Sequence, residues 1–208
     1  MDTKQRHLLS TKQQKSLIQA IRPQIRSFNK GDLIFDHETN ENRLCLLLKG
    51  TAYLCIENES AVMQLLDFFM KGQFFCYEMI PFPHNCHCFL QAKYPCSIAY
   101  LEKGSIRRFV NEAPDTETAL LLQNIFPSMI TAQSEHCHML QQKNIRGKLL
   151  AFLHYQQSLQ NSRIIHVPIP YSDLADYLTI DRSAMMTELT KMQREGLLEK
   201  SLHDIRIV

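Results

Sequence analysis

The sequence lacks the features that identify membrane, secreted or disulfide-rich proteins. No stretch approaches the roughly 18 apolar residues that a membrane-spanning helix requires. The first 21 residues contain no uninterrupted apolar segment of the kind found in signal peptides. The seven cysteines are odd in number and irregularly spaced, unlike a secreted disulfide framework. We therefore expect a cytoplasmic protein with mostly reduced thiols and no membrane partner.

The charge balance shows little excess of either sign. Lys and Arg number 23 against 21 Asp and Glu, which gives a net charge of +2. This excess is too small to indicate an anionic partner for the chain as a whole. Residues 1–140 are balanced, whereas residues 141–208 contain 9 basic and 7 acidic side chains. The excess therefore lies in the last third of the chain, where it is a hint of an anionic partner.

The N-terminal half has the pattern of an antiparallel β protein. Short apolar runs such as RLCLLLKG, TAYLCIE and CSIAYL are separated by Gly, Asn and Pro between residues 25 and 100. Strands spaced by roughly ten residues are typical of an antiparallel sandwich or barrel-like roll. Before them, residues 11–20 are expected to form a short helix with Thr11 or Ser10 as its N-cap.

Residues 116–140 change to a helical period. A spacing of alternating three and four residues joins Leu122, Ile125, Met129, Ala132 and His136. This a/d spacing makes a seam suited to another helix. We favour a dimer seam over packing on the chain's own sheet, because nothing later in the sequence could cover so long a helix. Pro127 predicts either a kink or a new helix with the proline in its first turn.

The last 38 residues predict a helix-turn-helix followed by a wing. YSDLADYL opens with Ser172 as the expected N-cap of a first short helix. Asp181 is expected to cap a second helix, which ends near Gly196 and has a buried stripe of Met185, Leu189 and Met192. LLEKSLHDIRIV then alternates around a polar turn, as a two-stranded wing does. A generic two-helix hairpin is the alternative, but the tight turn, the two caps, the small Ala175 at the expected helix crossing and the wing favour DNA binding. The fold class is therefore α+β.

The predicted DNA contacts lie on the second helix and the wing. Arg182, Ser183, Met186 and Thr187 are expected to face base edges, and an arginine can make a bidentate contact to guanine O6 and N7. Phosphate contacts are expected from two lysines and from the start of the first helix, namely Lys191, Lys200 and Ser172. No catalytic residue set is expected, so we predict a binding protein and not an enzyme.

The order of these elements resembles the cyclic AMP receptor protein/FNR (CRP/FNR) family of bacterial transcription regulators. The matching segments are FNKGDLIF, RLCLLLKGTAYL, GQFFCYEMIPF, AKYPCSIAYL, IRGKLLAFL and IPYSDLADYLTIDRSAMMTELTKMQREGLL. The resemblance implies a jelly-roll sensor domain at 1–110, a dimerisation helix at 111–140 and a winged helix-turn-helix at 141–208. It also implies a homodimer that reads a pseudo-palindromic operator on double-stranded DNA, contacts RNA polymerase and responds to an effector in the β-roll.

The expected effector pocket departs from the cyclic-nucleotide pattern of that family. Glu78 matches the glutamate that holds the ribose, but Tyr77 replaces the preceding glycine, and the Arg-Ser positions fall on Cys86 and His87. A cyclic phosphate needs the fixed, parallel donors of an arginine. None lies between residues 43 and 107. We therefore expect an effector that is not a cyclic nucleotide.

The segment FPHNCHCFL lies where related proteins hold the cyclic phosphate. If it is a strand, its side chains alternate, so His84, Cys86 and Cys88 share one face. Free cysteines are commonly small buried hydrophobes, and we expect that here. The alternative is a haem, metal or thiol-redox sensor, because some family members take haem ligands from this part of the roll. An iron–sulfur centre is not expected, since no cysteine precedes Cys45.

Two further departures leave alternatives open. Met186 and Thr187 stand in place of the family's Ser-Arg or Gly-Arg pair, which allows a β-roll dimer that has lost DNA binding. Thr179 occupies a turn position where glycine is usual and a β-branched residue is awkward. A metalloenzyme of the cupin type is disfavoured, because HNCHC lacks the ordered His and Glu partners of that fold.

Overall fold

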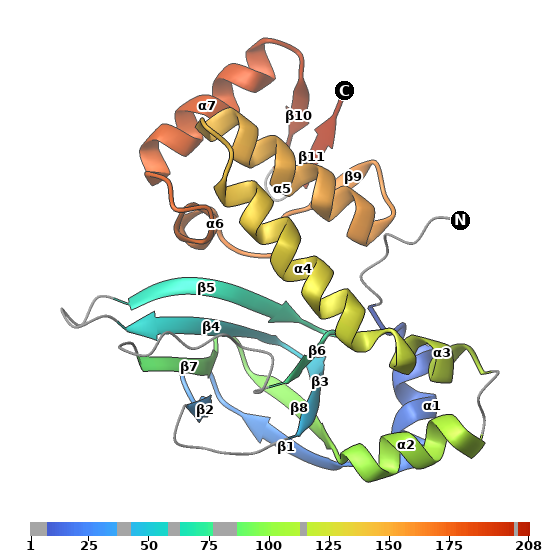
Figure 1. Ribbon diagram of the computed structural model, residues 1–208. Coiled ribbons are helices and arrows are strands. Elements are labelled where there is room, and N and C mark those ends of the chain that lie inside the picture. The colour runs from blue at the N-terminus through green and yellow to red at the C-terminus, as the bar shows by residue number, and fades with distance from the viewer. Residues whose placement is uncertain (1–7, 37–42, 58–62, 77–86, 113–115, 202–203) are drawn as a thin grey trace. The chain divides into compact units, whose positions relative to one another are not determined.

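Figure 1 shows a computed structural model of the chain, which describes residues 8–36, 43–57, 63–76, 87–112, 116–201 and 204–208. The chain folds as two units, an N-terminal unit at 7–129 and a C-terminal unit at 130–208. The elements that lie in the N-terminal unit are α1 (Thr11–Ile21), β1 (Gln24–Phe28), β2 (Leu33–Asp36), β3 (Leu44–Lys49), β4 (Thr51–Glu57), β5 (Met63–Met70), β6 (Phe74–Cys76), β7 (His87–Ala92), β8 (Cys96–Leu101), α2 (Lys103–Glu112) and α3 (Glu117–Gln123). Helix α4 (Ile125–Leu140) begins in this unit and ends in the next.

The eight strands among the described residues of the N-terminal unit form two antiparallel sheets. The strand orders are β1-β8-β3-β6 and β2-β7-β4-β5. Apart from the consecutive strands β4 and β5, neighbours in each order are far apart in sequence, as when β4 pairs with β7 and Ile56 lies opposite Cys88. This is the β-roll that the sequence predicts, and with the helices it confirms the α+β class.

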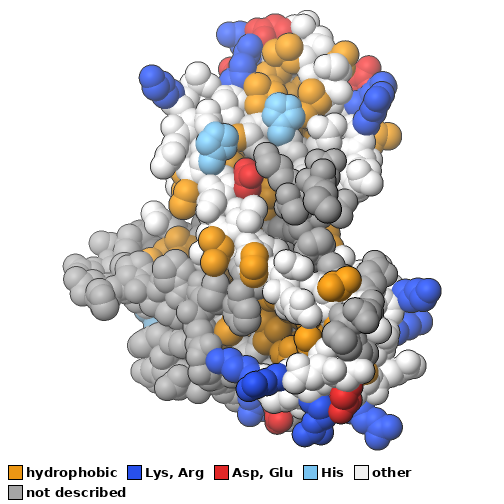
Figure 2. Space-filling model, turned by 45° about the vertical axis from the view of Figure 1, so that its right-hand side comes forward, with side chains coloured by type: hydrophobic (Ala, Val, Ile, Leu, Met, Phe, Trp, Pro, Cys, Tyr) orange, Lys and Arg blue, Asp and Glu red, His pale blue; other side chains and the backbone are white. Residues whose placement is uncertain are grey.

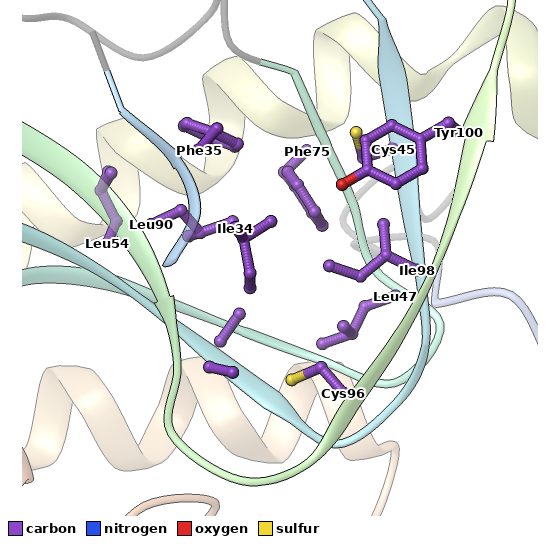
Figure 3. Close-up of a cluster of buried hydrophobic side chains, with 12 residues drawn as sticks. Ile34, Phe35, Cys45, Leu47, Leu54, Phe75, Leu90, Cys96, Ile98 and Tyr100 are labelled. Atoms are coloured by element: carbon purple, nitrogen blue, oxygen red, sulfur yellow. The ribbon is translucent and has the colours of Figure 1, made fainter. Parts of the chain in front are cut away.

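The main core lies between the two sheets. Figure 3 shows its side chains converging from opposite strands, with Phe75 near the middle. The ring of Phe75 lies 6.1 Å from that of Phe35 and 5.1 Å from that of Phe69, measured between centroids. The fully buried members of the cluster include Leu47, Leu90 and Ile98. Burying side chains of this size supplies most of the driving force for folding this unit.

A second apolar cluster covers the other face of the β1-β8-β3-β6 sheet. Leu46 of β3 and Leu101 of β8 point into it and meet Leu17 of α1. Strand β3 is therefore buried on both faces, which explains why RLCLLLKG reads as a continuous apolar run and does not alternate. Helix α1 begins at the predicted position with Ser10 as its N-cap, in a capping box with Gln13.

The predicted dimer seam is partly wrong. Leu122 and Ile125 are buried in the second cluster, with Met129 packed against it. These side chains cover the chain's own β-roll, which is the packing that the sequence argument had set aside. The spacing alone could not decide between the two, because a sheet and a second helix both accept an apolar stripe of that period. Pro127 lies in the first turn of α4, as the second alternative predicted.

The C-terminal unit contains the end of α4 and the predicted winged helix-turn-helix. Its remaining elements are α5 (Ile145–Gln160), β9 (Ile164–His166), α6 (Tyr171–Tyr177), α7 (Arg182–Arg194), β10 (Leu198–Lys200) and β11 (Asp204–Ile207). The wing is larger than the two strands expected, because β9 pairs with β11 and makes the sheet order β10-β11-β9. Among the described residues, no helix is long and apolar enough to cross a membrane.

Candidate nucleic-acid interface

Helix α6 begins slightly earlier in the chain than the sequence suggested. Its N-cap is Pro170, and the amide of Leu174 donates to the Pro170 carbonyl over 2.9 Å. Ser172 therefore lies in the first turn and is not the cap, and its hydroxyl donates to Asp173 Oδ1 over 2.9 Å. The prediction of Ser172 as N-cap is wrong, because Pro170 already has the extended backbone that a cap position needs.

The apolar side of α6 fixes it to the rest of the unit. Leu174 and Ala175 are each 1% exposed, and the small Ala175 lies at the position expected for the helix crossing. The Tyr177 ring stacks on the His136 ring of α4 with 3.9 Å between centroids, and His136 Nε2 lies 3.0 Å from the Tyr177 carbonyl oxygen. Since a carbonyl only accepts, His136 carries a proton on Nε2. His136, predicted for a dimer seam, thus contacts its own chain.

The turn after α6 has the strained geometry that the sequence suggested. Thr179 has a φ of 51°, in the left-handed region. Its amide donates to Asp176, and the amide of Ile180 donates to Ala175, each over 3.0 Å. This pair of bonds is a Schellman motif, which usually has glycine at the position of Thr179.

Helix α7 has the predicted cap, buried stripe and end. Asp181 Oδ1 accepts from the Ala184 amide over 2.8 Å and from the Ser183 hydroxyl over 2.5 Å. These two hydrogen bonds hold the pKa of the Asp181 carboxyl below its usual value. The buried stripe consists of three fully buried side chains, Met185, Leu189 and Met192. Gly196, with a φ of 74°, ends the helix in a second Schellman motif.

The outer side of α7 presents most of the predicted base-contacting residues. Arg182, Ser183 and Thr187 are exposed, whereas Met186 is half-buried. The Thr187 hydroxyl donates to the Ser183 carbonyl over 2.9 Å. The hydroxyls of Ser183 and Thr187 therefore both donate within the chain, and each keeps acceptor capacity toward a ligand.

The two predicted phosphate-binding lysines lie in different surroundings. Lys191 is exposed on α7 and lines an open cavity of about 450 Å³ with Arg146 and Glu188. Lys200 on β10 is half-buried, and its Nζ lies 4.6 Å from the centroid of the Tyr171 ring, a cation–π contact. Burial, and to a lesser extent the charge of Asp204, raises the pKa of Tyr171. Figure 2 shows that several Lys and Arg side chains of this unit lie beside Asp and Glu side chains.

No sequence pattern identified the residues that hold α7, and the turn before it, against α5. Arg146 donates through Nε to Glu188 over 2.5 Å and through Nη1 and Nη2 to Glu195 over 2.7 and 3.1 Å. Its guanidinium thereby ties α5 to the middle and the C-terminal end of α7, and it lowers the pKa of Glu195. Lys148 donates to the turn at Thr179. Both cations lie in IRGKLLAFL, one of the segments that carry the family resemblance, and no local pattern pairs them with residues 30 or more positions away.

The expected effector pocket is only partly described. Tyr77, Glu78, His84 and Cys86 lie outside the described residues. His87 is half-exposed at the start of β7, and its Nδ1 lies 3.7 Å from the carboxylate of Glu57 on the neighbouring strand. Among the residues that the structure describes, no three His, Cys, Asp or Glu side chains are grouped as a metal site.

The described cysteines of the β-roll are buried. Cys88 is 0% exposed and points inward from β7, which favours its interpretation as a small core residue. Cys96 is also buried, and burial raises the pKa of its thiol. A raised pKa keeps a thiol protonated and unreactive. Cys137 on α4 is exposed.

Comparison with known proteins agrees with this architecture. Residues 25–113 match the cyclic nucleotide-binding domain family. A CooA mutant from Carboxydothermus hydrogenoformans has a TM-score of 0.74 at 16% identity, with 97% of this chain and 94% of that chain covered. CprK complexed with OCPA has a TM-score of 0.69 at 15% identity, with 98% and 94% covered. TTHB099, a transcriptional regulator of the CRP family from Thermus thermophilus, has a TM-score of 0.56 at 15% identity, with 88% and 91% covered. No curated protein matches the sequence.

The fold is therefore that of a β-roll joined to a winged helix-turn-helix. The resemblance in fold to the CRP/FNR transcription regulators is confirmed by the solved structures, among them TTHB099.

Proposed function

We propose that this chain is a transcription regulator of the CRP/FNR type that binds double-stranded DNA through α7. The observation that carries the proposal is the orientation of α7, which buries Met185, Leu189 and Met192 and exposes Arg182, Ser183 and Thr187 at its N-terminal end. In a helix-turn-helix, N-terminal residues of the second helix face base edges in the major groove. Arg182 is the residue suited to a guanine, through O6 and N7.

Contacts to the DNA backbone complete the proposed interface. Lys191 is exposed on α7, and Lys200 lies on the wing beside Tyr171. The amide of Ser172 lies in the first turn of α6, where helical amides have no partner within the helix. These groups supply phosphate contacts, which position the protein without reading sequence.

The active form in this proposal is a homodimer on a pseudo-palindromic operator. Since Leu122 and Ile125 are buried in the chain's own core, we place the dimer seam on the other side of α4. Ile130 is 55% exposed there, and Ser134 and Cys137 follow it at helical spacing and are exposed too. Two copies related by two-fold symmetry then present two α7 helices to successive major grooves.

The effector in this proposal is held by the β-roll and is not a cyclic nucleotide. The matched domain spans residues 25–113, but the sequence has no arginine between residues 43 and 107 to bind a cyclic phosphate. CprK, which shares the fold, is known complexed with OCPA. An absorption spectrum and metal analysis of protein purified without oxygen separate an organic effector from haem or metal at the His84–Cys88 segment. Contact with RNA polymerase and a cytoplasmic location belong to the same proposal.

A DNA selection tests the proposed function. Purified protein is incubated with a library of random-sequence duplexes, with and without metabolite extract, and bound sequences are amplified over several rounds. We expect enrichment of a two-fold symmetric sequence. Arg182→Ala should weaken binding to it by the about 1–3 kcal/mol that one bidentate base contact supplies, whereas Arg163→Ala, outside the helix-turn-helix, should leave binding unchanged. Failure to enrich any sequence under either condition contradicts the proposal and favours a β-roll protein without DNA binding.

A further inference from the structure

The turn between α6 and α7 combines a strained residue with a lysine from a third helix. Thr179, with its φ of 51°, is a β-branched residue in the conformation that glycine adopts most easily. The Nζ of Lys148 on α5 donates to the Thr179 hydroxyl over 3.0 Å and to the Leu178 carbonyl over 2.8 Å. Lys148 therefore bonds both the end of α6 and the side chain that makes the turn unusual.

The chemistry of this contact suits a lysine and a threonine together. The carbonyls at the end of α6 carry the negative end of the helix dipole, which an ammonium group stabilises. An ammonium has three donors, so one lysine can hold a carbonyl and a hydroxyl at once. Glycine at position 179 would relieve the backbone strain but would offer Lys148 no hydroxyl. The pair Lys148–Thr179 thus takes the place of the usual glycine.

The conformation of this turn decides where α7 starts. Only Ile180 and the N-cap Asp181 separate Thr179 from the first residue of α7. Helix α7 rises about 1.5 Å per residue, so Thr187 lies about 8 Å beyond Arg182, and a tilt of about 10° at the start of the helix moves Thr187 by about 1.3 Å. A binding site tolerates displacements of only about 0.5 Å or 10–20° before contacts weaken.

We propose that Lys148 is a positioning residue for DNA recognition, which fixes α7 by holding the left-handed turn at Thr179. This inference rests on the proposed function and adds a residue whose side chain points to the turn and not to the base-contacting face. Removing the Lys148 ammonium group should reduce the preference of the protein for one DNA sequence over others. A lysine that bound a phosphate directly would instead contribute equally to all sequences.

The experiment compares Lys148→Met, Thr179→Gly, the double variant and Lys191→Met, all in the full-length protein. The probes are the duplex selected by the wild-type protein and a scrambled duplex of the same length, and affinities are measured by fluorescence anisotropy at several salt concentrations. For Lys148→Met we expect at least about a tenfold loss on the selected duplex, less than about a threefold change on the scrambled one, and an unchanged salt slope. Lys191→Met should weaken both and lower the slope by about 0.9.

Thr179→Gly provides the decisive comparison. Glycine adopts a positive φ without a stabilising contact. In the Thr179→Gly background, Lys148→Met should therefore weaken binding to the selected duplex by less than about threefold. In Lys148→Met with Thr179 present, hydrogen exchange should accelerate at the amides of Thr179 and Ile180 but not at Leu189. Acceleration throughout α7 would indicate general unfolding and overturn the positioning role.

Three other outcomes would contradict the positioning role of Lys148. If Lys148→Met loses affinity equally for both duplexes and has a lower salt slope, Lys148 contacts a phosphate directly. An unchanged affinity for the selected duplex, or an equally large loss in the Thr179→Gly background, refutes positioning through Thr179. These results leave the proposed function intact. If the wild-type protein selects no duplex at all, the proposed function and this inference fail together.

Discussion

The two sides of helix α7 should respond to substitution in opposite ways. Leu189 is 0% exposed and packs inward, whereas Thr187 is exposed. Replacing a fully buried leucine by alanine removes its transfer free energy and leaves a cavity, at a cost of about 2–5 kcal/mol. Replacing an exposed threonine changes stability by less than about 0.5 kcal/mol.

These free energies translate into distinct melting temperatures. The C-terminal unit spans residues 130–208, and in a domain of about 80 residues each 1 kcal/mol shifts Tm by about 4–8 °C. Leu189→Ala should therefore lower the Tm of this unit by about 10 °C or more, and Thr187→Ala by less than about 4 °C. Differential scanning calorimetry of the full-length chain measures both shifts, because the two units can unfold in separate transitions.

DNA binding should rank the same two variants in the reverse order. Below the melting transition of both variants, Thr187→Ala should weaken binding to the selected duplex by up to the 1–3 kcal/mol that one base-pair mismatch costs, roughly 5- to 150-fold. Leu189→Ala should keep the base preference of the wild type. The orientation of α7 described above is refuted if Thr187→Ala lowers Tm as much as Leu189→Ala does.

Two further predictions concern titratable groups. The hydrogen bonds from Arg146 lower the pKa of Glu195, so their stabilising contribution is present above the unfolded-state pKa of about 4.3 and is lost as the pH falls through the lower folded value. The urea midpoint of the C-terminal unit should thus fall less steeply with acidification in Arg146→Met than in the wild type, and identical pH profiles would contradict the ion pair. Burial raises the pKa of Cys96 whereas Cys137 is exposed in the single chain, so in the monomer, diluted until the proposed dimer dissociates, iodoacetamide at a pH of about 8 should alkylate Cys137 before Cys96. Peptide mass mapping over time measures the order, and equal rates at both thiols would show that Cys96 is accessible.

Contacts within the C-terminal unit occupy some of its basic side chains. Residues 141–208 contain 9 basic side chains against 7 acidic ones. Arg146 is paired with Glu188 and Glu195, and Lys148 is directed at the turn after α6. Both cations stabilise the protein itself. The cations left for an anionic partner are therefore fewer than the count from the sequence, and sequence-specific contacts such as that proposed for Arg182 gain in importance.

Local features of the sequence were reliable guides to secondary structure. Ser10 and Asp181 cap helices where their side chains and spacing predicted, and Gly196 ends α7. Caps and ends depend on hydrogen bonds within four residues, so the necessary information is local. Ser172 is the exception, since Pro170 took the cap position and the serine hydroxyl bonded Asp173 instead.

Contacts between distant segments were decided by the tertiary structure. The a/d spacing through Leu122 and Ile125 predicted an apolar stripe correctly, but its partner is the chain's own β-roll. A stripe records that a face is buried and not which surface buries it.

The sequence by itself determined the order of a β-roll, a long helix and a winged helix-turn-helix, together with the inward stripe of α7. It also revealed the loss of the arginine that a cyclic phosphate needs. Only the tertiary structure decided that Lys148 reaches Thr179 and that Arg146 reaches Glu195, across 31 and 49 positions of the chain. Helical and strand periods arise from neighbours along the backbone, whereas these contacts depend on how whole helices pack.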